Sequence, residues 1–249
     1  MPSIARASVI LDTIAESRRP LSLSELSERL GIPRSSVHRV VRTLEEELFV
    51  VRSQSGVGFS LGPGLLKFGM NSHLRLLAAN RQSLLALARE VQENVDLAVF
   101  SGREIVVADQ IVSPARMKGV TKVGQSFSLH ASCIGKALLA QLPQTRVDEL
   151  LRLQPMKRFT ERTVTERAAL DEELEAVRAT GLAFDFQEHD EGISAVATGM
   201  VGPTGARQAV AVVMSSRDLP GKWDAVLAGL ARINPVIDTA AAAARRPPR

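Results

Sequence analysis

The chain has 249 residues, more than one typical domain, and its hydrophobic fraction of 45% is enough to fill a core, which excludes global disorder. The formal net charge of +4 is compatible with nucleic-acid binding but is too small to demonstrate it. The single cysteine, Cys133, excludes an internal disulfide framework and any metal site built from several cysteines.

The first segment carries apolar residues at helical spacing from Ile4 to Ile14, which predicts a helix that ends near Ser17. Arginines and acids interrupt these apolar residues, so the segment lacks the pattern of a secretory signal. No apolar run reaches the roughly 20 residues that a membrane-spanning helix needs. We therefore expect a cytoplasmic protein without a membrane partner.

The stretch from Leu21 to Arg52 has the pattern of two short amphipathic helices joined by a tight turn. Ser22 and Glu25 form an S-x-x-E capping box, which predicts a helix start directly after Ser22. Gly31 is expected to end this helix in the left-handed conformation. Pro33 suits the first turn of a second helix, because the amide that proline lacks would be unpaired there.

The second helix is expected to bury one apolar stripe and to leave a polar face in solvent. Val37, Val40, Val41 and Leu44 follow the i, i+3, i+4, i+7 spacing of that stripe. Small hydroxyl groups and arginines on the early turns of such a helix suit the major groove of DNA. The predicted DNA-binding residues are Arg34, Ser35, Ser36, His38, Arg39, Arg42 and Thr43.

A β-hairpin is expected directly after this helix pair. Phe49 to Val51 and Phe59 to Leu61 read as its strands, with Ser53 to Gly58 as the turn. Such a hairpin is typical of the wing of a winged helix-turn-helix. An αα-hairpin without any nucleic-acid role remains the alternative, but the hairpin and the first helix favour DNA binding.

A helix-permissive segment follows the break at Gly62-Pro63-Gly64. We expect a linker helix over residues 65–79 and a separate helix from Arg81 to Val95. An exposed apolar stripe is costly in a monomer, so the linker is expected to pair between subunits. A helix packed on its own domain is the alternative. The apolar residues of the linker are Leu65, Leu66, Phe68, Leu74, Leu76 and Leu77.

The remaining chain alternates between strand and helix patterns and predicts an α/β domain. The expected strands are Asp96 to Phe100, Glu104 to Ile111, one or two within Val120 to Phe127, Ala183 to Gln187, Ile193 to Val201 and Gln208 to Ser215. The expected helices are Ala131 to Ala140, Thr145 to Leu153, Thr165 to Thr180 and Trp223 to Ala244, followed by a disordered tail.

Two places could in principle carry chemistry. Cys133 lies near a helix start with His130 close in sequence, but a lone cysteine there is more often a packing residue than a nucleophile. His189 lies among acids, yet no second histidine stands at ligand spacing, so a solvated turn is favoured over a metal site. We expect no enzyme, no cofactor and no metal. The acids beside His189 are Asp185, Glu188, Asp190 and Glu191.

Three motifs along the chain resemble the IclR-type bacterial transcription regulators. They are LSLSELSERLGIPRSSVHRVVRTLEEELFV near the start, LHASCIGKALLA from Leu129 to Ala140, and GLAFDFQEHDEGISAVATGM from Gly181 to Met200. The resemblance implies a winged helix-turn-helix domain (1–64), a linker helix (65–79) and a C-terminal effector-binding domain of GAF-like α/β fold (80–249). It also implies binding of operator DNA by a homodimer or a dimer of dimers, and a repressor of a catabolic operon is the favoured role. Alternatives are an enzymatic or metal-sensing effector domain, or a DNA-architectural protein without an effector.

The resemblance places a small-molecule effector in a cavity of the C-terminal domain. Backbone amides at a helix start can hold a carboxylate, and apolar side chains can surround the rest of an organic acid. The family often has a cysteine where this chain has Ala195, and members that bind small polar acids have a hydroxyl where it has Val213, so a less polar, aromatic or larger acid is expected. The implied effector residues are Met117, Leu129, Ser132, Cys133, Ile134, Gly135, Asp185, Ile193, Ala195, Val213 and Ser215.

Overall fold

The computed structural model describes residues 2–17, 19–53, 56–114, 121–203 and 205–243. The chain forms two compact units, Met1–Leu76 and Leu77–Arg249, which are described separately. The division falls inside the expected linker. Met117 and the expected disordered tail lie outside the described residues. Within the described ranges no helix is both long enough and apolar enough to span a membrane.

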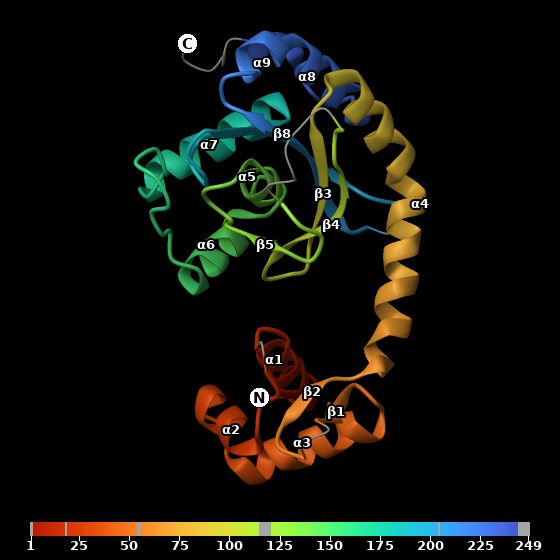
Figure 1. The fold of residues 1–249 in the computed structure, drawn as a ribbon. Coiled ribbons are helices and arrows are strands. Elements are labelled where there is room, and N and C mark those ends of the chain that lie inside the picture. The colour runs from red at the N-terminus through yellow and green to blue at the C-terminus, as the bar shows by residue number, and fades with distance from the viewer. Residues whose placement is uncertain (1, 18, 54–55, 115–120, 204, 244–249) are drawn as a thin grey trace. The chain divides into compact units, whose positions relative to one another are not determined.

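The N-terminal unit is a helix-turn-helix with a wing (Figure 1). Its elements are α1 Ser3–Ala15, α2 Leu23–Leu30, α3 Arg34–Glu46, and the antiparallel strands β1 Val50–Arg52 and β2 Phe59–Leu61. The capping box of Ser22 and Glu25 is present as predicted, and Gly31 ends α2 with a left-handed φ of 62°. Pro33 is the residue before α3 rather than part of its first turn.

The core of this unit joins all three helices to the wing. The alternation of the strands turns Val50 and Phe59 inward, so the wing packs against the helices that it follows in sequence. Burial of this stripe, and not intrinsic helix propensity, holds such short helices. The buried residues are Ile10, Ile14, Leu21, Leu26, Val37, Val41, Leu44, Val50 and Phe59.

The expected pair of helices after the wing is a single helix. A short 3-10 turn, Pro63–Leu65, leads into α4, Leu66–Val91, which is 26 residues long. The prediction of a separate helix from Arg81 to Val95 is therefore wrong, because α4 runs on from the predicted linker helix (65–79) without a break. No proline or glycine breaks the segment near residue 80, and Val95 belongs instead to the first strand of the C-terminal unit.

The C-terminal unit is built on a six-stranded antiparallel sheet of order β5-β4-β3-β8-β7-β6. Its strands are β3 Asn94–Phe100, β4 Ile105–Ile111, β5 Ser126–Phe127, β6 Leu182–Phe186, β7 Ile193–Val201 and β8 Arg207–Ser215. Its helices after α4 are α5 Cys133–Leu139, α6 Gln144–Leu153, α7 Arg167–Thr180, α8 Leu219–Ile233 and α9 Thr239–Ala243. The predicted α/β domain is confirmed.

Two predicted elements differ from the structure. Within the described part of Val120 to Phe127, only β5 is a strand. The long helix expected from Trp223 to Ala244 is split into α8 and α9. Asn234 adopts an extended conformation (φ −125°, ψ 98°) because the following Pro235 disfavours the helical region for the residue before it.

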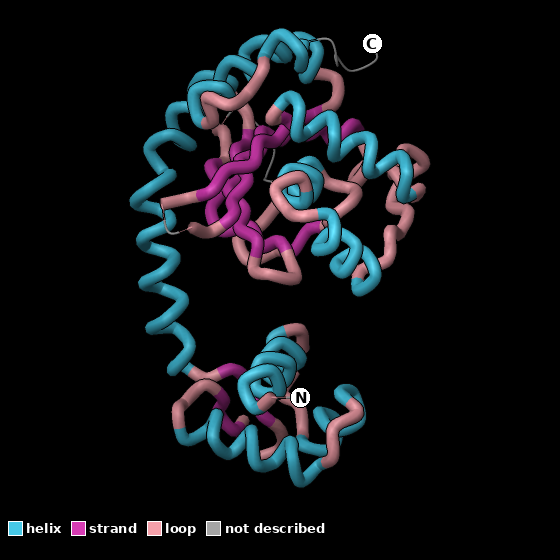
Figure 2. Tube along the Cα trace, turned by 180° about the vertical axis from the view of Figure 1, so that it is seen from behind, coloured by secondary structure: helices cyan, strands magenta, loops and turns pink. Residues whose placement is uncertain are grey.

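Helices cover both faces of the sheet (Figures 1 and 2), with α5, α6 and α7 on one face and α8 on the other. Every residue of α5 is buried, because this helix lies directly on the sheet. Small side chains on the facing strands permit this close approach. They include Ala183, Ala195, Ala197, Ala209 and Ala211.

Gly135 lets α5 pass the preceding loop. A Cβ atom at this position would lie 2.3 Å from the carbonyl oxygen of Leu129 and 2.4 Å from that of Ser128. Both neighbours are backbone, so neither can move aside as a flexible side chain would. The contact therefore fixes the approach of the loop to the helix.

We expect Gly135→Ala to lower the free energy of unfolding by about 1–3 kcal/mol or more, because it overpacks a buried site. Gly221→Ala is the matched control, since Gly221 is also helical and nothing lies within 4 Å of its added Cβ. The control should be neutral or should gain up to about 1 kcal/mol from helix propensity. Urea denaturation measures both, and equal stability of the two variants would contradict the steric account.

Candidate functional site

The polar face of α3 is open to solvent. Its apolar stripe is anchored by Val37, Val41 and Leu44, which are buried. This leaves Ser36 half-buried and the other predicted DNA-binding residues exposed. The exposed residues are Arg34, Ser35, His38, Arg39, Arg42 and Thr43.

The cations on and beside this face fall into two groups. Arg42 Nε lies 3.1 Å from Glu46 Oε1, and Arg52 on the wing lies 2.9 Å from Glu45 Oε1. Arg34 and Arg39 make no hydrogen bond or ion pair through their side chains within the described residues. Two guanidinium groups on the first turns of α3 are therefore available to an anionic or hydrogen-bonding partner.

A small cavity lies in the C-terminal unit between α5 and the sheet, with a volume of about 30 Å³. This is about the volume of one water molecule in the liquid. It brings together seven of the predicted effector residues with five that sequence reasoning missed. The predicted ones are Ser132, Cys133, Ile134, Asp185, Ile193, Ala195 and Val213, and the missed ones are Asp96, Thr121, Phe127, His189 and Asp190.

Three other predicted effector residues do not line this cavity. Leu129 is buried and borders a larger neighbouring hollow. Gly135 packs under the loop before α5, as described above. Ser215 is half-buried at the end of β8, where it pairs with Ile193 across the strands. Gly135 and Ser215 lie close in sequence to residues that line the cavity, but neighbouring residues in a helix or strand point in different directions. Closeness in sequence therefore did not place them in the cavity wall.

Asp185 lies on the cavity side of β6, as the period-2 alternation predicts. Phe184 and Phe186 point to the other face, where the ring of Phe184 stacks on Trp223 of α8 at 5.3 Å. Asp185 Oδ1 accepts a hydrogen bond from the amide of Glu188 at 2.7 Å. Burial raises the pKa of Asp185 to about 6 despite this bond, so the carboxyl group can hold a proton near neutral pH.

The start of α5 is already engaged within the chain. Ser132 Oγ accepts the amide hydrogen of Gly135 at 3.0 Å, and the carbonyl of Ser132 accepts that of Lys136. The expectation that amides at this helix start hold a carboxylate is therefore wrong for Gly135, because its amide is used by the cap.

Asp96 faces the cavity from β3 and is fully buried, with an exposed fraction of 0%. Gln110 donates to its Oδ1 at 3.0 Å, while its Oδ2 has no hydrogen-bond partner within the described residues. Burial raises the pKa of Asp96, and its polar neighbours Thr121 and Gln110 oppose the shift. A charge-bearing residue in the middle of the buried strand NVDLAVF was the sequence signal for this site.

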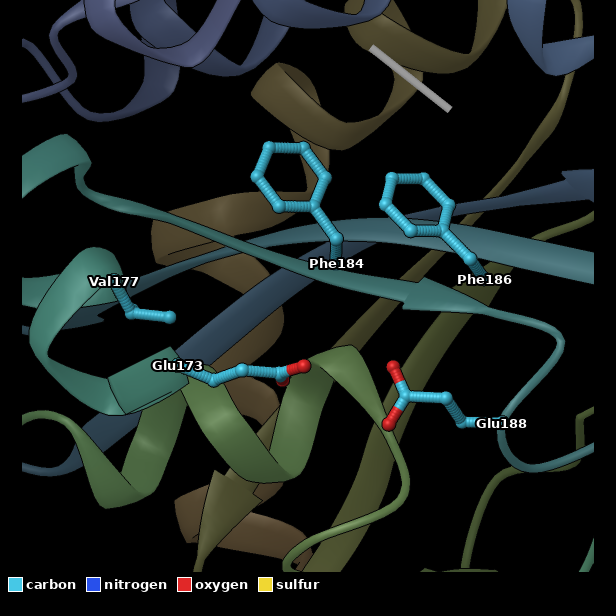
Figure 3. A pocket seen from close by; sticks show the side chains of 5 residues that line it. All are labelled: Glu173, Val177, Phe184, Phe186 and Glu188. Carbon is cyan, nitrogen blue, oxygen red and sulfur yellow. The ribbon is translucent and has the colours of Figure 1, made fainter. Parts of the chain in front are cut away.

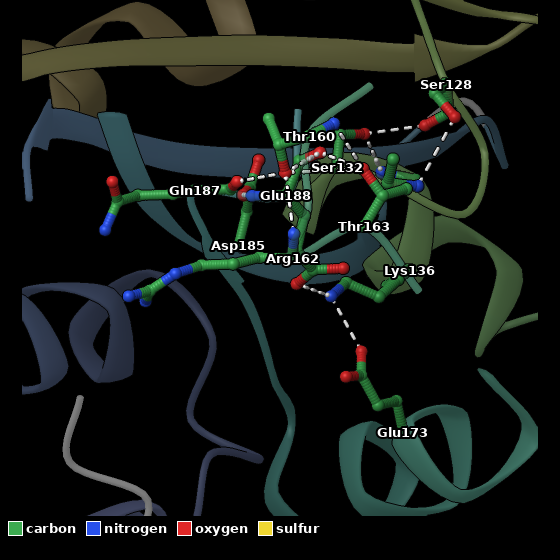
Figure 4. Close-up of polar contacts among 12 residues, drawn as sticks. Ser128, Ser132, Lys136, Thr160, Arg162, Thr163, Glu173, Asp185, Gln187 and Glu188 are labelled. Atoms are coloured by element: carbon green, nitrogen blue, oxygen red, sulfur yellow. Dashed lines mark hydrogen bonds and ion pairs between the residues drawn. The ribbon is translucent and has the colours of Figure 1, made fainter. Parts of the chain in front are cut away.

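A buried lysine connects α5 to the loop after β6 (Figure 4). Lys136 has an exposed fraction of 1%, and its Nζ lies 2.7 Å from Glu173 Oε2 and 2.6 Å from Glu188 Oε1. Burial lowers the pKa of Lys136, but the two carboxylates outweigh it and raise this pKa overall. The hydroxyl of Thr163 donates to the Glu188 carbonyl at 2.7 Å and holds the loop from its other side.

Two further hollows adjoin this region. One, of about 230 Å³, is lined by Glu173, Val177, Phe184, Phe186 and Glu188, and Figure 3 shows the two carboxylates facing one another across it. The other, of about 400 Å³, includes Leu129, His130 and Phe159 in its lining. The ring of His189 stacks on that of Phe159, with 5.0 Å between the ring centroids. Phe127 and His189 line both the small cavity and the larger hollow, so these two side chains lie between them.

The geometry also bears on the candidate chemistry. Burial raises the pKa of the Cys133 thiol well above its usual range, which disfavours the reactive thiolate. The acids near His189 have separate partners, Asp185 with the Glu188 amide and Glu188 with Lys136. No group of three ligand-type side chains gathers in a metal-binding arrangement within the described ranges.

The burial of the Glu188 carboxyl group predicts a pH dependence of stability. Burial raises the pKa of Glu188 to about 7 from an ordinary 4.5. Between these values the folded state keeps a proton that the unfolded chain has lost, so this group makes stability fall as pH rises from about 4.5 to 7. The loss is at most about 1.4 kcal/mol per pH unit. Lys136, Glu173 and Asp185 are the charged groups that act on Glu188.

We expect Glu188→Gln to flatten the fall in unfolding temperature between pH 5 and pH 7, because it removes the titrating group. Glu191→Gln in the same loop is the matched control, since Glu191 is exposed. Calorimetric scans at several pH values measure the slopes. The assignment is contradicted if the Glu188 variant keeps the wild-type slope.

Comparisons with known proteins agree with both units. The profile described as the IclR helix-turn-helix domain matches residues 3–54, and that of the bacterial transcriptional regulator IclR C-terminal domain matches residues 69–233. The HTH-type transcriptional regulator Rv1719 of Mycobacterium tuberculosis is 37% identical, over 91% of this chain and 86% of its own. The transcriptional repressor IclR of Escherichia coli is 31% identical, over 78% of this chain and 73% of its own.

The crystal structure of an IclR-type transcriptional regulator from Silicibacter sp. shares the fold. It has a TM-score of 0.84 at 24% identity and covers 93% of this chain and 92% of its own. The proteins and domain families matched are transcriptional regulators and not enzymes. The chain therefore belongs to the IclR family of bacterial transcriptional regulators, with an N-terminal helix-turn-helix domain and a C-terminal effector-binding domain.

Proposed function

We propose that this regulator is a repressor of a catabolic operon that binds operator DNA through α3 and responds to a small organic acid. The observation that carries the proposal is the combination of two sites on separate units of one chain. One is a helix face with two arginines that have no side-chain partner among the described residues, and the other is a small cavity lined in part by the buried carboxyl groups of Asp96 and Asp185. The repressor role is supported by the name of the Escherichia coli relative.

The proposed DNA contacts follow from the position of each side chain on α3. Arg39 and Ser36 lie off the buried stripe of α3 and are assigned to base edges in the major groove. Arg34 and Arg42, which also lie off this stripe, are assigned to phosphates. The ion pair of Arg42 with Glu46 is exposed and can exchange for a phosphate at little cost.

We expect Arg39→Ala to cost about 1–3 kcal/mol on the operator and little on random DNA. Arg42→Ala should weaken both complexes and reduce the salt slope by about one unit, because it removes a phosphate contact. Fluorescence anisotropy titrations at several salt concentrations measure these effects. Arg217→Ala in the C-terminal unit controls for the loss of one positive charge. Equal losses for the two α3 variants on both DNAs would reject the assignment.

The first half of α4 is proposed to form part of a homodimer contact. Leu66, Met70 and Leu74 follow one another at i, i+4 and i+8 and have exposed fractions of 60%, 59% and 59%. Such a stripe is costly in water and favours burial against a second copy. A dimer, alone or as half of a tetramer, would then bind two half-sites about 34 Å apart or at a multiple of this spacing.

Leu74→Glu is expected to weaken the dimer at least tenfold, because it places a charge in the apolar contact. Leu153→Glu is the matched control, since Leu153 on α6 is also an exposed leucine, with an exposed fraction of 66%. Sedimentation velocity at micromolar concentration measures the association. A wild-type monomer that still binds the operator tightly would overturn the dimer proposal.

The cavity beside α5 is the proposed effector site, and its charges constrain how an acid could bind. Lysine and arginine are absent from its described lining, whereas Asp96, Asp185 and Asp190 are present. A carboxylate can lie beside Asp185 when the two groups share one proton, which the raised pKa of Asp185 favours. The body of the ligand needs more than 30 Å³, and displacement of Phe127 and His189 would join the cavity to the larger hollow.

We expect Asp185→Ala and Ile134→Trp each to abolish the response of operator binding to the effector, with effector-free operator affinity nearly unchanged. The first removes the proton-sharing group and the second fills the cavity. A panel of benzoates and short 2-oxo acids, added to operator titrations, identifies the acid that acts on the wild type. Its affinity should fall about tenfold per pH unit above pH 6, as the shared proton is lost. If both variants still respond at wild-type concentrations, the effector site lies elsewhere.

A further inference from the structure

Asp96 is a buried carboxyl group of the cavity whose hydrogen bonds the described residues leave incomplete. Gln110 occupies one oxygen of its carboxyl group, and the other, Oδ2, has no partner within the described part of the chain. The residue is fully buried and lines the cavity. A buried acceptor without a partner is unfavourable, so it is rare in folded proteins and commonly marks a ligand site or an ordered water.

The surroundings of Asp96 indicate what could complete it. Gln110 holds the carboxyl group in place, and the hydroxyl of Thr121 lies against the amide of Gln110. The cavity has room for about one water-sized group next to these side chains. A hydroxyl group has this size, and it can replace such a water by reproducing its hydrogen bond.

A hydroxyl also fits better than an ammonium group. Burial favours the neutral form of this carboxyl group, and a neutral carboxyl group attracts a cation weakly. A hydroxyl donates one hydrogen and accepts others, so it can pair with Asp96 in either protonation state. An ammonium group only donates and would lose its hydration in a cavity whose other walls include Cys133 and Val213.

We propose that Asp96 is a specificity-determining residue of the effector site and selects organic acids that carry a hydroxyl group, which Asp96 Oδ2 binds. The inference rests on the proposed function of the cavity and names the ligand class more closely. In this proposal Asp185 shares a proton with the acid group of the ligand, and Asp96 forms a hydrogen bond with its hydroxyl group. A site built around a hydroxyl discriminates strongly against the analogue that lacks it, because the buried acceptor is then left unpaired.

Calorimetric titrations with matched probes test this selection. The probes are benzoate, 3-hydroxybenzoate, 4-hydroxybenzoate, 4-aminobenzoate and 4-methylbenzoate. We expect a hydroxybenzoate to bind at least tenfold more tightly than benzoate and 4-methylbenzoate. Asp96→Leu should abolish this preference, because leucine has a similar size and offers a ligand hydroxyl neither a donor nor an acceptor. Asp148→Leu, at a half-exposed position on α6, should keep it.

Several outcomes would overturn the proposal. A stronger preference for 4-aminobenzoate would assign the site to amines, and an equal hydroxyl preference in Asp96→Leu would remove Asp96 from the selection. If no hydroxybenzoate binds the wild type, this hydroxylated class is wrong. Thermal unfolding without probe gives a further check, since a purely structural Asp96 would make Asp96→Leu clearly less stable. Operator titrations separate these results from a failure of the proposed function, in which hydroxyl-selective binding persists without any effect on DNA.

Discussion

The buried ion pair of Lys136 is the interaction on which the C-terminal unit depends. An ammonium group that is 1% exposed must be paired, and Glu173 and Glu188 supply the partners from α7 and from the loop after β6. Removing either carboxylate leaves a buried charge less compensated, which is far more costly than losing a surface pair. The pairing therefore determines where α5, α7 and this loop meet.

The same pairing organises the cavity. The loop that carries Glu188 also carries His189 and Asp190, so anchoring Glu188 on Lys136 brings the next two side chains to the cavity wall. Asp185 contributes from the preceding strand and accepts the amide of Glu188. Consecutive residues thus have different roles: the side chain of Glu188 points to Lys136, whereas those of His189 and Asp190 line the cavity. A bound effector that changes Asp185 would act on the loop directly, which offers a route from binding to conformational change.

The two units solve different physical problems. The helix-turn-helix needs a rigid helix with free polar groups. The buried apolar residues of α3 therefore lie in one stripe, and Arg34 and Arg39 have no side-chain partner within the described residues. The effector domain needs buried polar groups at defined positions, which requires a large core around them. Its antiparallel sheet and the alanines beneath α5 supply that core. A ligand must bind the DNA-competent and incompetent states differently in order to shift their populations.

Local signals in the sequence determined much of the fold. The capping box at Ser22, the left-handed Gly31 and the stripe on α3 depend on near neighbours, and strand alternation placed Asp185 opposite its phenylalanines. Tertiary structure decided what depends on distant residues. It joined the two predicted helices into α4, gave Lys136 its partners 37 and 52 residues away, and left Asp96 Oδ2 facing the cavity. No local pattern encodes these contacts, because burial and pairing arise only when separate elements pack.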